Sequence, residues 1–221
     1  DLAVDRRVRF GRFYARRFRR LLPASALAII GTAVVYSWVA SPAEVANAVD
    51  GFRASFLYVA NWFFIRESTD YFASGNADSP VLHFWSLAVE EQFYLLWPLL
   101  LAGLTASLGA LGARMWTGVR VIVALGAVTS LAWAWHLSTA SPDRAYYGTD
   151  TRAYQLLAGA LVAMTPSLVN RVRRRDLLFA PVAVLSLTGL VVASTDALVM
   201  RPVARGVLAT VLTLALIVSL E

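Results

Sequence analysis

Long stretches without a single charged residue are the feature that most restricts how this chain can fold. The longest cover residues 21–43, 92–113, 121–142, 153–170 and 177–195, and a shorter one covers 206–220. Each long stretch is close to the roughly 20 residues that a helix needs to cross a bilayer. Only 15% of the residues are charged, whereas soluble domains carry about 25%. The sequence therefore predicts an all-α fold, a polytopic transmembrane helix bundle.

Hydropathy and arginine positions together predict six or seven spans. Six are visible as 21–40, 84–108, 119–137, 153–168, 177–195 and 203–220. The apolar segment 54–65 is short and aromatic, which is typical of an interfacial or re-entrant segment, but a full crossing stays open. If 54–65 does not cross, the basic stretches 1–20, 114–120 and 171–175 all lie on the cytoplasmic side, as arginines in membrane proteins usually do. This consistency favours six spans.

Chain ends and composition narrow the class of protein further. The sequence starts at Asp1 and its last apolar run stops at Glu221, so we expect 1–221 to be one partial membrane domain, truncated at both ends. The net charge of +6 comes from arginines that flank apolar segments, which indicates loop orientation and not nucleic-acid binding. There is no cysteine, and the two histidines have no metal-ligand spacing, so no metal site is expected.

Polar side chains interrupt one predicted span in the stretch HFWSLAVEEQFYLLWPLLL, residues 83–101. At helical spacing Ser86, Glu90 and Tyr94 lie along one face, with His83 nearly one turn earlier. Ionisable residues inside a membrane are costly and usually functional. The stripe predicts a catalytic site that faces the bundle interior at the outer membrane boundary, with Glu90 suited to acid–base chemistry.

A structural interpretation of the same stretch stays open. Glu91 points about 100° away from Glu90 on a helix. Either glutamate could form an ion pair with an arginine such as Arg152 and lock two helices together. The two adjacent carboxylates could also divide the work, one pairing while the other takes part in catalysis.

Residues 9–24, RFGRFYARRFRRLLPA, form a second pattern. Apolar and aromatic side chains recur on one face at Phe10, Tyr14, Phe18 and Leu21. With arginines over the remaining surface, residues 1–20 are typical of a basic amphipathic helix lying on the cytoplasmic face of the membrane. One interpretation is a topology signal and lipid anchor. The other is that Arg16, Arg17 or Arg20 binds the phosphates of a cytoplasmic donor, because guanidinium forks suit that contact.

The third pattern is YYGTDTRAYQLLAGALVA, residues 146–163, where an outside loop enters a span. Arg152 stands at that end of the span. It could face Glu90 or an anionic group of a substrate, or it could be an ordinary interfacial arginine.

These three stretches together resemble the acyltransferase 3 family of bacterial membrane proteins. FYARRFRRLLPA is similar to the family's F-Y-x-R-R-x-x-R-x-x-P segment, and LHFWSLAVEEQFYLLWPLLL matches its most recognisable stretch almost residue for residue. TDTRAYQLLAGAL resembles its T-x-T-R-x-W-E-L-x-x-G-A segment, with Tyr154 and Gln155 in place of Trp and Glu. The resemblance covers essentially the whole chain.

The resemblance implies a multi-pass protein of the bacterial cytoplasmic membrane that moves an acyl group, commonly acetyl, to a carbohydrate hydroxyl. It implies acyl-CoA as co-substrate, no bound cofactor, membrane lipids as surroundings, and a cell-surface or lipid-linked carbohydrate as acceptor. By resemblance, Ser86, Glu90 and Tyr94 fall in the family's S-x-x-x-E-x-x-x-Y pattern, and Arg17 and Arg20 in its basic loop.

The family's catalytic histidine belongs to a first span that we expect to precede Asp1, and neither His83 nor His136 is expected to replace it. We therefore expect 1–221 alone to be inactive. Two rival functions stay open: a transporter or flippase of a lipid-linked glycan, and an inactive scaffold. A transporter predicts paired interrupted helices in two related halves, and no such repeat stands out in the sequence.

Overall fold

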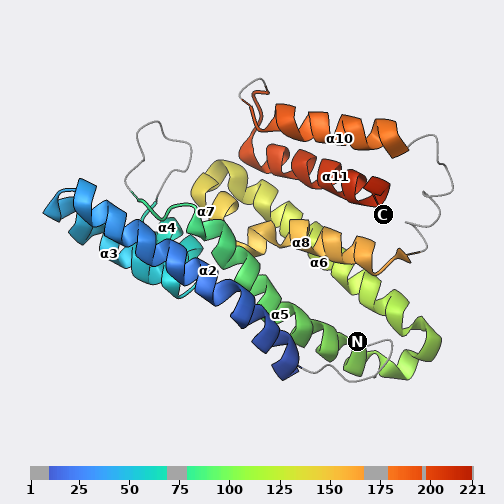
Figure 1. The fold of residues 1–221 in the computed structure, drawn as a ribbon. Coiled ribbons are helices and arrows are strands. Elements are labelled where there is room, and N and C mark those ends of the chain that lie inside the picture. The colour runs from blue at the N-terminus through green and yellow to red at the C-terminus, as the bar shows by residue number, and fades with distance from the viewer. Residues whose placement is uncertain (1–9, 69–78, 167–178, 196–197, 221) are drawn as a thin grey trace. The chain divides into compact units, whose positions relative to one another are not determined.

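The fold is helical wherever the structure describes the chain (Figure 1). The computed structural model describes residues 10–68, 79–166, 179–195 and 198–220. All regular elements in these ranges are helices, which confirms the predicted all-α class. The basic stretch predicted at 171–175 and the first nine residues of the predicted surface helix lie outside the described residues.

Two compact units make up the chain. The first comprises Asp1–Ala110 with Tyr147–Thr149, and the second comprises Leu111–Tyr146 with Asp150–Glu221. We describe each unit by itself.

Four helical stretches in the described part of the chain are long and apolar enough to cross a membrane. They are α2 (Phe10–Val39), α5 (Phe84–Ser107), the stretch Gly109–Ala140 with η1 (Gly109–Arg114) and α6 (Met115–Ala140), and α11 (Pro202–Leu220). Helices α8 (Thr149–Ala163) and α10 (Phe179–Ala193) also match predicted spans, with 15 residues each in the part of the chain that the structure describes. At 1.5 Å per residue they cover roughly 22 Å, short of the roughly 30 Å of a hydrocarbon core.

Helix α2 runs without a break from the arginine-rich stretch into the apolar one. The sequence predicts a surface helix that meets a span at Pro23, but Pro23 lies inside α2. Proline removes one backbone hydrogen bond, and membrane helices tolerate that loss where neighbouring groups compensate. The arginines and the apolar stretch therefore share one helix axis.

In the first unit, α3 (Pro42–Phe56) lies beside α2 (Figure 1). The helix starts with a capping box, in which the Ser41 hydroxyl accepts from the Glu44 N–H and the Glu44 carboxylate accepts from the Ser41 N–H. Ala48, Gly51 and Ala54 are buried on α3. Small residues let helix backbones approach closely, so this face packs without large side chains.

The predicted segment 54–65 is not one helix. The chain turns after α3 at Tyr58, whose φ is 55°, and continues as α4 (Ala60–Arg66), which has 7 residues. Such a helix covers roughly 10 Å, so 54–65 does not form a continuous membrane-crossing helix. This geometry agrees with the interfacial or re-entrant interpretation.

In the second unit, α10 packs against α11, and α11 packs against α6. A small hydrophobic core is formed by Ala134, Ala145, Tyr154 and Val203. The backbone N–H of Tyr154 also donates to the Ser130 hydroxyl at 2.9 Å. This bond fixes the register between α8 and α6.

Candidate active site

A bidentate ion pair joins the arginine-rich part of α2 to the middle of α5. Arg17 Nε donates to Glu91 Oε2 at 3.1 Å and Nη2 donates to Oε1 at 2.6 Å. The side chains of Arg17 and Glu91 are 23% and 14% exposed. Two parallel charge-assisted bonds hold both groups in a fixed orientation. The structure thus contains the predicted helix-locking pair for Glu91, with Arg17 and not Arg152 as the partner.

Tyr94 and Tyr14 extend this contact along both helices. The guanidinium carbon of Arg17 lies 3.2 Å from the centroid of the Tyr94 ring, a cation–π contact. One helical turn before Arg17, the Tyr14 hydroxyl donates to the Leu95 carbonyl at 2.7 Å. These contacts keep the first turns of α2 against the first half of α5.

Glu90 lies at a hollow of about 720 Å³ between the same two helices. The hollow is lined by Phe13, Arg16, Arg17, Arg20, Leu21, Glu90 and Tyr94. Glu90 is exposed there, and within the described part of the chain its carboxylate makes no hydrogen bond or ion pair. The two adjacent glutamates therefore have different surroundings. Glu91 is ion-paired with Arg17, whereas the Glu90 carboxylate faces the hollow.

This arrangement corrects the predicted placement of the polar stripe. The sequence predicts arginines at the cytoplasmic surface and Glu90 at the outer boundary, on opposite sides of the membrane. In the structure Arg16, Arg17 and Arg20 surround the same hollow as Glu90. The reason is that the arginines belong to α2 itself, and its first turns run alongside α5 instead of lying separately on the membrane surface.

The earlier part of the predicted stripe stays outside the hollow. Ser86 and His83 are exposed near the start of α5, and neither is among the residues that line the hollow. The Ser86 hydroxyl donates to the His83 carbonyl at 3.1 Å. In the ranges that the structure describes, no group of three or more His, Asp or Glu side chains is arranged to hold a metal ion.

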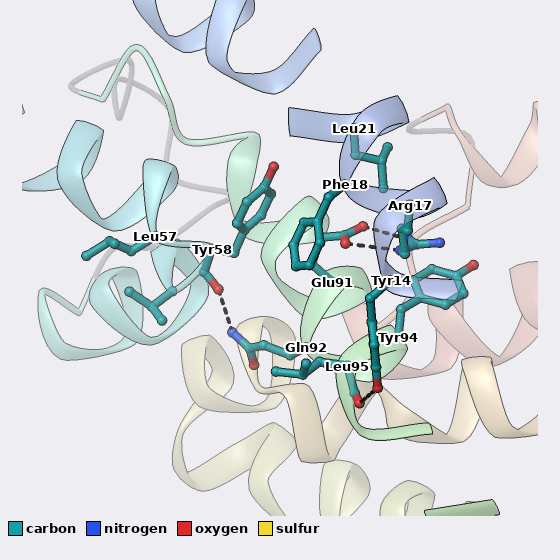
Figure 2. Close-up of a pocket in the computed structure, with 11 residues that line it drawn as sticks. Tyr14, Arg17, Phe18, Leu21, Leu57, Tyr58, Glu91, Gln92, Tyr94 and Leu95 are labelled. Atoms are coloured by element: carbon teal, nitrogen blue, oxygen red, sulfur yellow. Dashed lines mark hydrogen bonds and ion pairs between the residues drawn. The ribbon is translucent and has the colours of Figure 1, made fainter. Parts of the chain in front are cut away.

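A second pocket, of about 260 Å³, adjoins the hollow (Figure 2). It is lined by Tyr14, Arg17, Phe18, Leu21, Leu57, Tyr58, Val59, Glu91, Gln92, Tyr94 and Leu95. Figure 2 shows that these side chains come from α2, from the turn between α3 and α4, and from α5. The Arg17–Glu91 pair forms one wall of this pocket, and apart from Gln92 the other lining residues are apolar or aromatic.

A network of hydrogen bonds from the side-chain amides of Gln92 and Asn61 holds the pocket wall at Tyr58. The Gln92 side-chain amide donates to the Tyr58 carbonyl at 2.8 Å and to Asn61 Oδ1 at 3.0 Å. Asn61, fully buried, donates to the Tyr147 carbonyl at 3.1 Å and to the Thr149 hydroxyl at 2.9 Å. Our sequence reasoning missed this network. The available signal was an asparagine within the apolar run ASFLYVANWFFI, where an amide needs buried partners.

Replacing Asn61 with leucine should destabilise the fold. Leucine fills similar space but removes the hydrogen bonds of Asn61 to the Tyr147 carbonyl, the Thr149 hydroxyl and the Gln92 amide, at about 1–3 kcal/mol for a buried polar group. Thermal unfolding of the purified protein in detergent measures the loss. Asn47→Leu, at an exposed position of α3, is the matched control and should change stability by less than about 0.5 kcal/mol. Equal melting temperatures for both variants would contradict a stabilising role of the network.

In the second unit, Arg152 has partners of its own. Its Nε donates to the Tyr146 carbonyl at 2.8 Å, and its guanidinium stacks over the Tyr146 ring at 4.4 Å. Two residues earlier, the Asp150 carboxylate accepts two hydrogen bonds from Arg144, from Nη1 to Oδ1 and from Nη2 to Oδ2, both at 2.7 Å. Burial acts to raise the pKa of Asp150, but the hydrogen bonds and charge of Arg144 outweigh it and lower that pKa overall. These contacts fix the start of α8.

Comparison with known proteins gives the family. The chain matches the family described as "Acyltransferase domain" over residues 5–220. It is 39% identical over 158 residues to "Peptidoglycan O-acetyltransferase OatA" of Listeria monocytogenes, which covers 68% of this chain and 24% of that protein. It is 38% identical over 167 residues to "Putative peptidoglycan O-acetyltransferase YrhL" of Bacillus subtilis, covering 74% and 25% respectively.

A third relative, "O-acetyltransferase OatA" of Staphylococcus aureus, is 34% identical over 151 residues, 68% of this chain and 24% of that protein. The matches thus span about a quarter of the length of these curated relatives. No solved structure matches the chain. Because the family match extends over nearly all of its residues, the chain belongs to the acyltransferase 3 family.

Proposed function

We propose that the full-length protein is an enzyme of the bacterial cytoplasmic membrane that transfers an acetyl group to a hydroxyl of a cell-wall carbohydrate, with acyl-CoA as the donor. Family membership supports acyl transfer. The names of two relatives point to peptidoglycan as the acceptor. The four long apolar stretches support a multi-pass position in the membrane.

The observation that carries this proposal is the hollow at Glu90. The Glu90 carboxylate, which has no hydrogen bond or ion pair with any residue that the structure describes, faces a space lined by three arginines. Guanidinium groups are well suited to bind phosphates, and the CoA part of the donor carries several phosphate groups. Because Arg17 has its fork engaged by Glu91, we assign the phosphate contact to Arg20, with the positive charges of Arg16 and Arg17 beside it.

Glu90 is then the group for the chemistry. We assign it the task of orienting and polarising the catalytic histidine that the family resemblance implies, as a carboxylate does for a general base. Tyr94 lines the same hollow and is held by Arg17, and we assign it a supporting role beside Glu90. Ser86 and His83 lie near the start of α5 and do not line the hollow, so we assign them no part in the chemistry.

Arg20→Ala tests the donor site. Loss of a charge-assisted phosphate contact of about 1.5–3 kcal/mol should raise KM for acetyl-CoA about 10- to 100-fold and leave kcat less affected. The assay follows labelled acetyl from acetyl-CoA to base-labile esters on cell-wall carbohydrate in membranes that contain the full-length protein. Arg19→Ala, an exposed neighbour on α2 that lines neither the hollow nor the adjoining pocket, is the matched control.

Three results would count against the proposal. If the wild-type membranes transfer no label from acetyl-CoA, acyl-CoA is not the donor. If the label enters a product other than carbohydrate, the acceptor class is wrong. If Arg20→Ala and Arg19→Ala have the same KM as the wild type, the hollow does not bind the phosphates.

A further inference from the structure

A cluster of aromatic and charged side chains lies in the second unit, where α6 ends and α8 begins. The Trp133 indole stacks on the His136 imidazole, with ring centroids 5.6 Å apart and 24° between the planes. Trp133 Nε1 donates to Asp150 Oδ2 at 3.1 Å. Arg144, from α7 (Pro142–Tyr147), donates twice to the same carboxylate. We call these four side chains the Trp133 cluster, and none of them lines the hollow at Glu90 or the second pocket.

The Trp133 cluster is held in place and is also open to solvent. Trp133 is 44% exposed, the Asp150 side chain is 45% exposed, and His136 is exposed as well. The Ser130 hydroxyl donates to the Asp150 carbonyl, which ties the start of α8 to α6. Among the residues that the structure describes, none forms a hydrogen bond with the imidazole of His136. A fixed aromatic surface thus lies beside polar groups that a ligand can reach.

Trp133 differs from the other exposed tryptophans near the ends of apolar helices. Trp135 and Trp38 are more exposed than Trp133, and within the described part of the chain neither indole has a ring contact or a hydrogen bond. Tryptophans of that kind are typical of the aromatic belts at membrane–water interfaces. A belt does not need a fixed ring. A binding site gains from one, because the ligand then does not have to immobilise the side chain.

The Trp133 cluster lies at the opposite end of α6 from the arginine that precedes this helix. From Met115, which follows Arg114, to His136 the helix rises about 32 Å. That rise is close to the roughly 30 Å of a hydrocarbon core. Since arginines flank membrane spans mainly on the cytoplasmic side, we expect the Trp133 cluster on the outer side, where cell-wall carbohydrate is found.

The chemistry of the Trp133 cluster suits a sugar ring. The face of an aromatic ring carries partial negative charge, so the C–H groups on one face of a pyranose pack favourably against an indole. The hydroxyls at the edge of the sugar donate to a carboxylate or exchange hydrogen bonds with an imidazole. Asp150 and His136 offer these groups next to Trp133. A lipid chain would leave both polar groups unused, and an anionic ligand would be repelled by the Asp150 carboxylate.

We propose that the Trp133 cluster binds the carbohydrate acceptor, with Trp133 as the stacking surface and with Asp150 and His136 as hydrogen-bonding partners of sugar hydroxyls. This inference rests on the proposed function, because it names the groups that recognise the acceptor of that reaction. The cluster contributes affinity for the glycan and takes no part in the acetyl transfer itself. Its loss therefore affects binding of the acceptor and not the chemical step.

Trp133→Ala in the full-length protein tests this site in the transfer assay. With soluble glycan strands of peptidoglycan as the acceptor, the variant should raise KM for the strands about tenfold. The kcat value and KM for acetyl-CoA should stay unchanged. Trp135→Ala is the matched control, since it removes a more exposed indole from the same end of α6, and it should change none of the three values.

Direct binding is measured without turnover. Calorimetry with the same glycan strands and the purified full-length protein in detergent, without acetyl-CoA, should give equal affinities for the wild type and Trp135→Ala. The affinity of Trp133→Ala should be about tenfold weaker. Melting temperatures of the same samples reveal a folding defect. Trp133→Phe keeps an aromatic face at this position, so it should retain most of the affinity even if the alanine variant does not fold.

The outcomes separate this inference from the function on which it rests. Wild-type membranes that transfer no acetyl from acetyl-CoA would defeat the proposed function, and calorimetry would still test the site. Absence of glycan binding by the wild type would overturn the site, as would equal affinities of Trp133→Ala and Trp135→Ala. Lower melting temperatures of both alanine variants with unchanged affinity would also overturn it, and would identify Trp133 as a membrane anchor.

Discussion

Glu90→Gln should lower acetyl transfer by about a hundredfold to ten-thousandfold, the range of a positioned acid–base group. Glutamine keeps the size of the side chain but removes the negative charge that faces the hollow. Because Glu90 makes no hydrogen bond or ion pair within the described residues, the change breaks no contact that stabilises the fold. Transfer rate and protein level in membranes are measured together on the full-length protein.

Asp50→Asn is the matched control for this loss of one carboxylate. Asp50 pairs with Arg53 on the surface of α3, and both side chains are more than 70% exposed. We expect normal acetyl transfer from this variant. Unchanged acetyl transfer by Glu90→Gln at a normal protein level would show that Glu90 takes no part in the chemistry.

Breaking the Arg17–Glu91 pair should produce the largest loss of stability. Removing one partner leaves the other charge partly buried without compensation, which costs about 3 kcal/mol for a buried pair. Glu91→Gln should therefore lower the melting temperature in detergent clearly. Arg17→Ala should lower it at least as much, because it also removes the cation–π contact with Tyr94.

The double variant Arg17→Met with Glu91→Leu separates the ion pair from simple packing. Replacing both partners with apolar groups leaves no unpaired charge, so the double variant should be more stable than Glu91→Gln. The exposed Asp50–Arg53 pair is the internal comparison, since surface pairs contribute only about 0.2–1 kcal/mol. Additive losses in the double variant would show that the two side chains do not act as a pair.

Much of the local structure follows from the sequence alone. The apolar run with polar interruptions predicts a helix at 84–108, and α5 spans Phe84–Ser107. The short aromatic stretch 54–65 favours an interfacial or re-entrant segment over a full crossing, and the chain turns at Tyr58. These features depend on hydrophobicity and on length against the bilayer, and a sequence displays both directly.

The composition of the candidate site was only partly predictable. Glu90 and Tyr94 were found because they lie four residues apart on one helix. The arginines were found because they are dense. That these two groups share one hollow was not predictable, since it depends on α2 continuing through Pro23 and running beside α5.

By itself, the sequence indicated a helical protein of the acyltransferase 3 family with helices apolar enough to cross a membrane, one of which carries a polar stripe. Only the tertiary structure decided that Glu91 pairs with Arg17 while Glu90 stays open, and that Gln92 and Asn61 support the neighbouring pocket. Helical periodicity fixes which residues share a face of one helix. It carries no information about which other helix that face meets, and the partner of a buried charge or amide is set by that meeting.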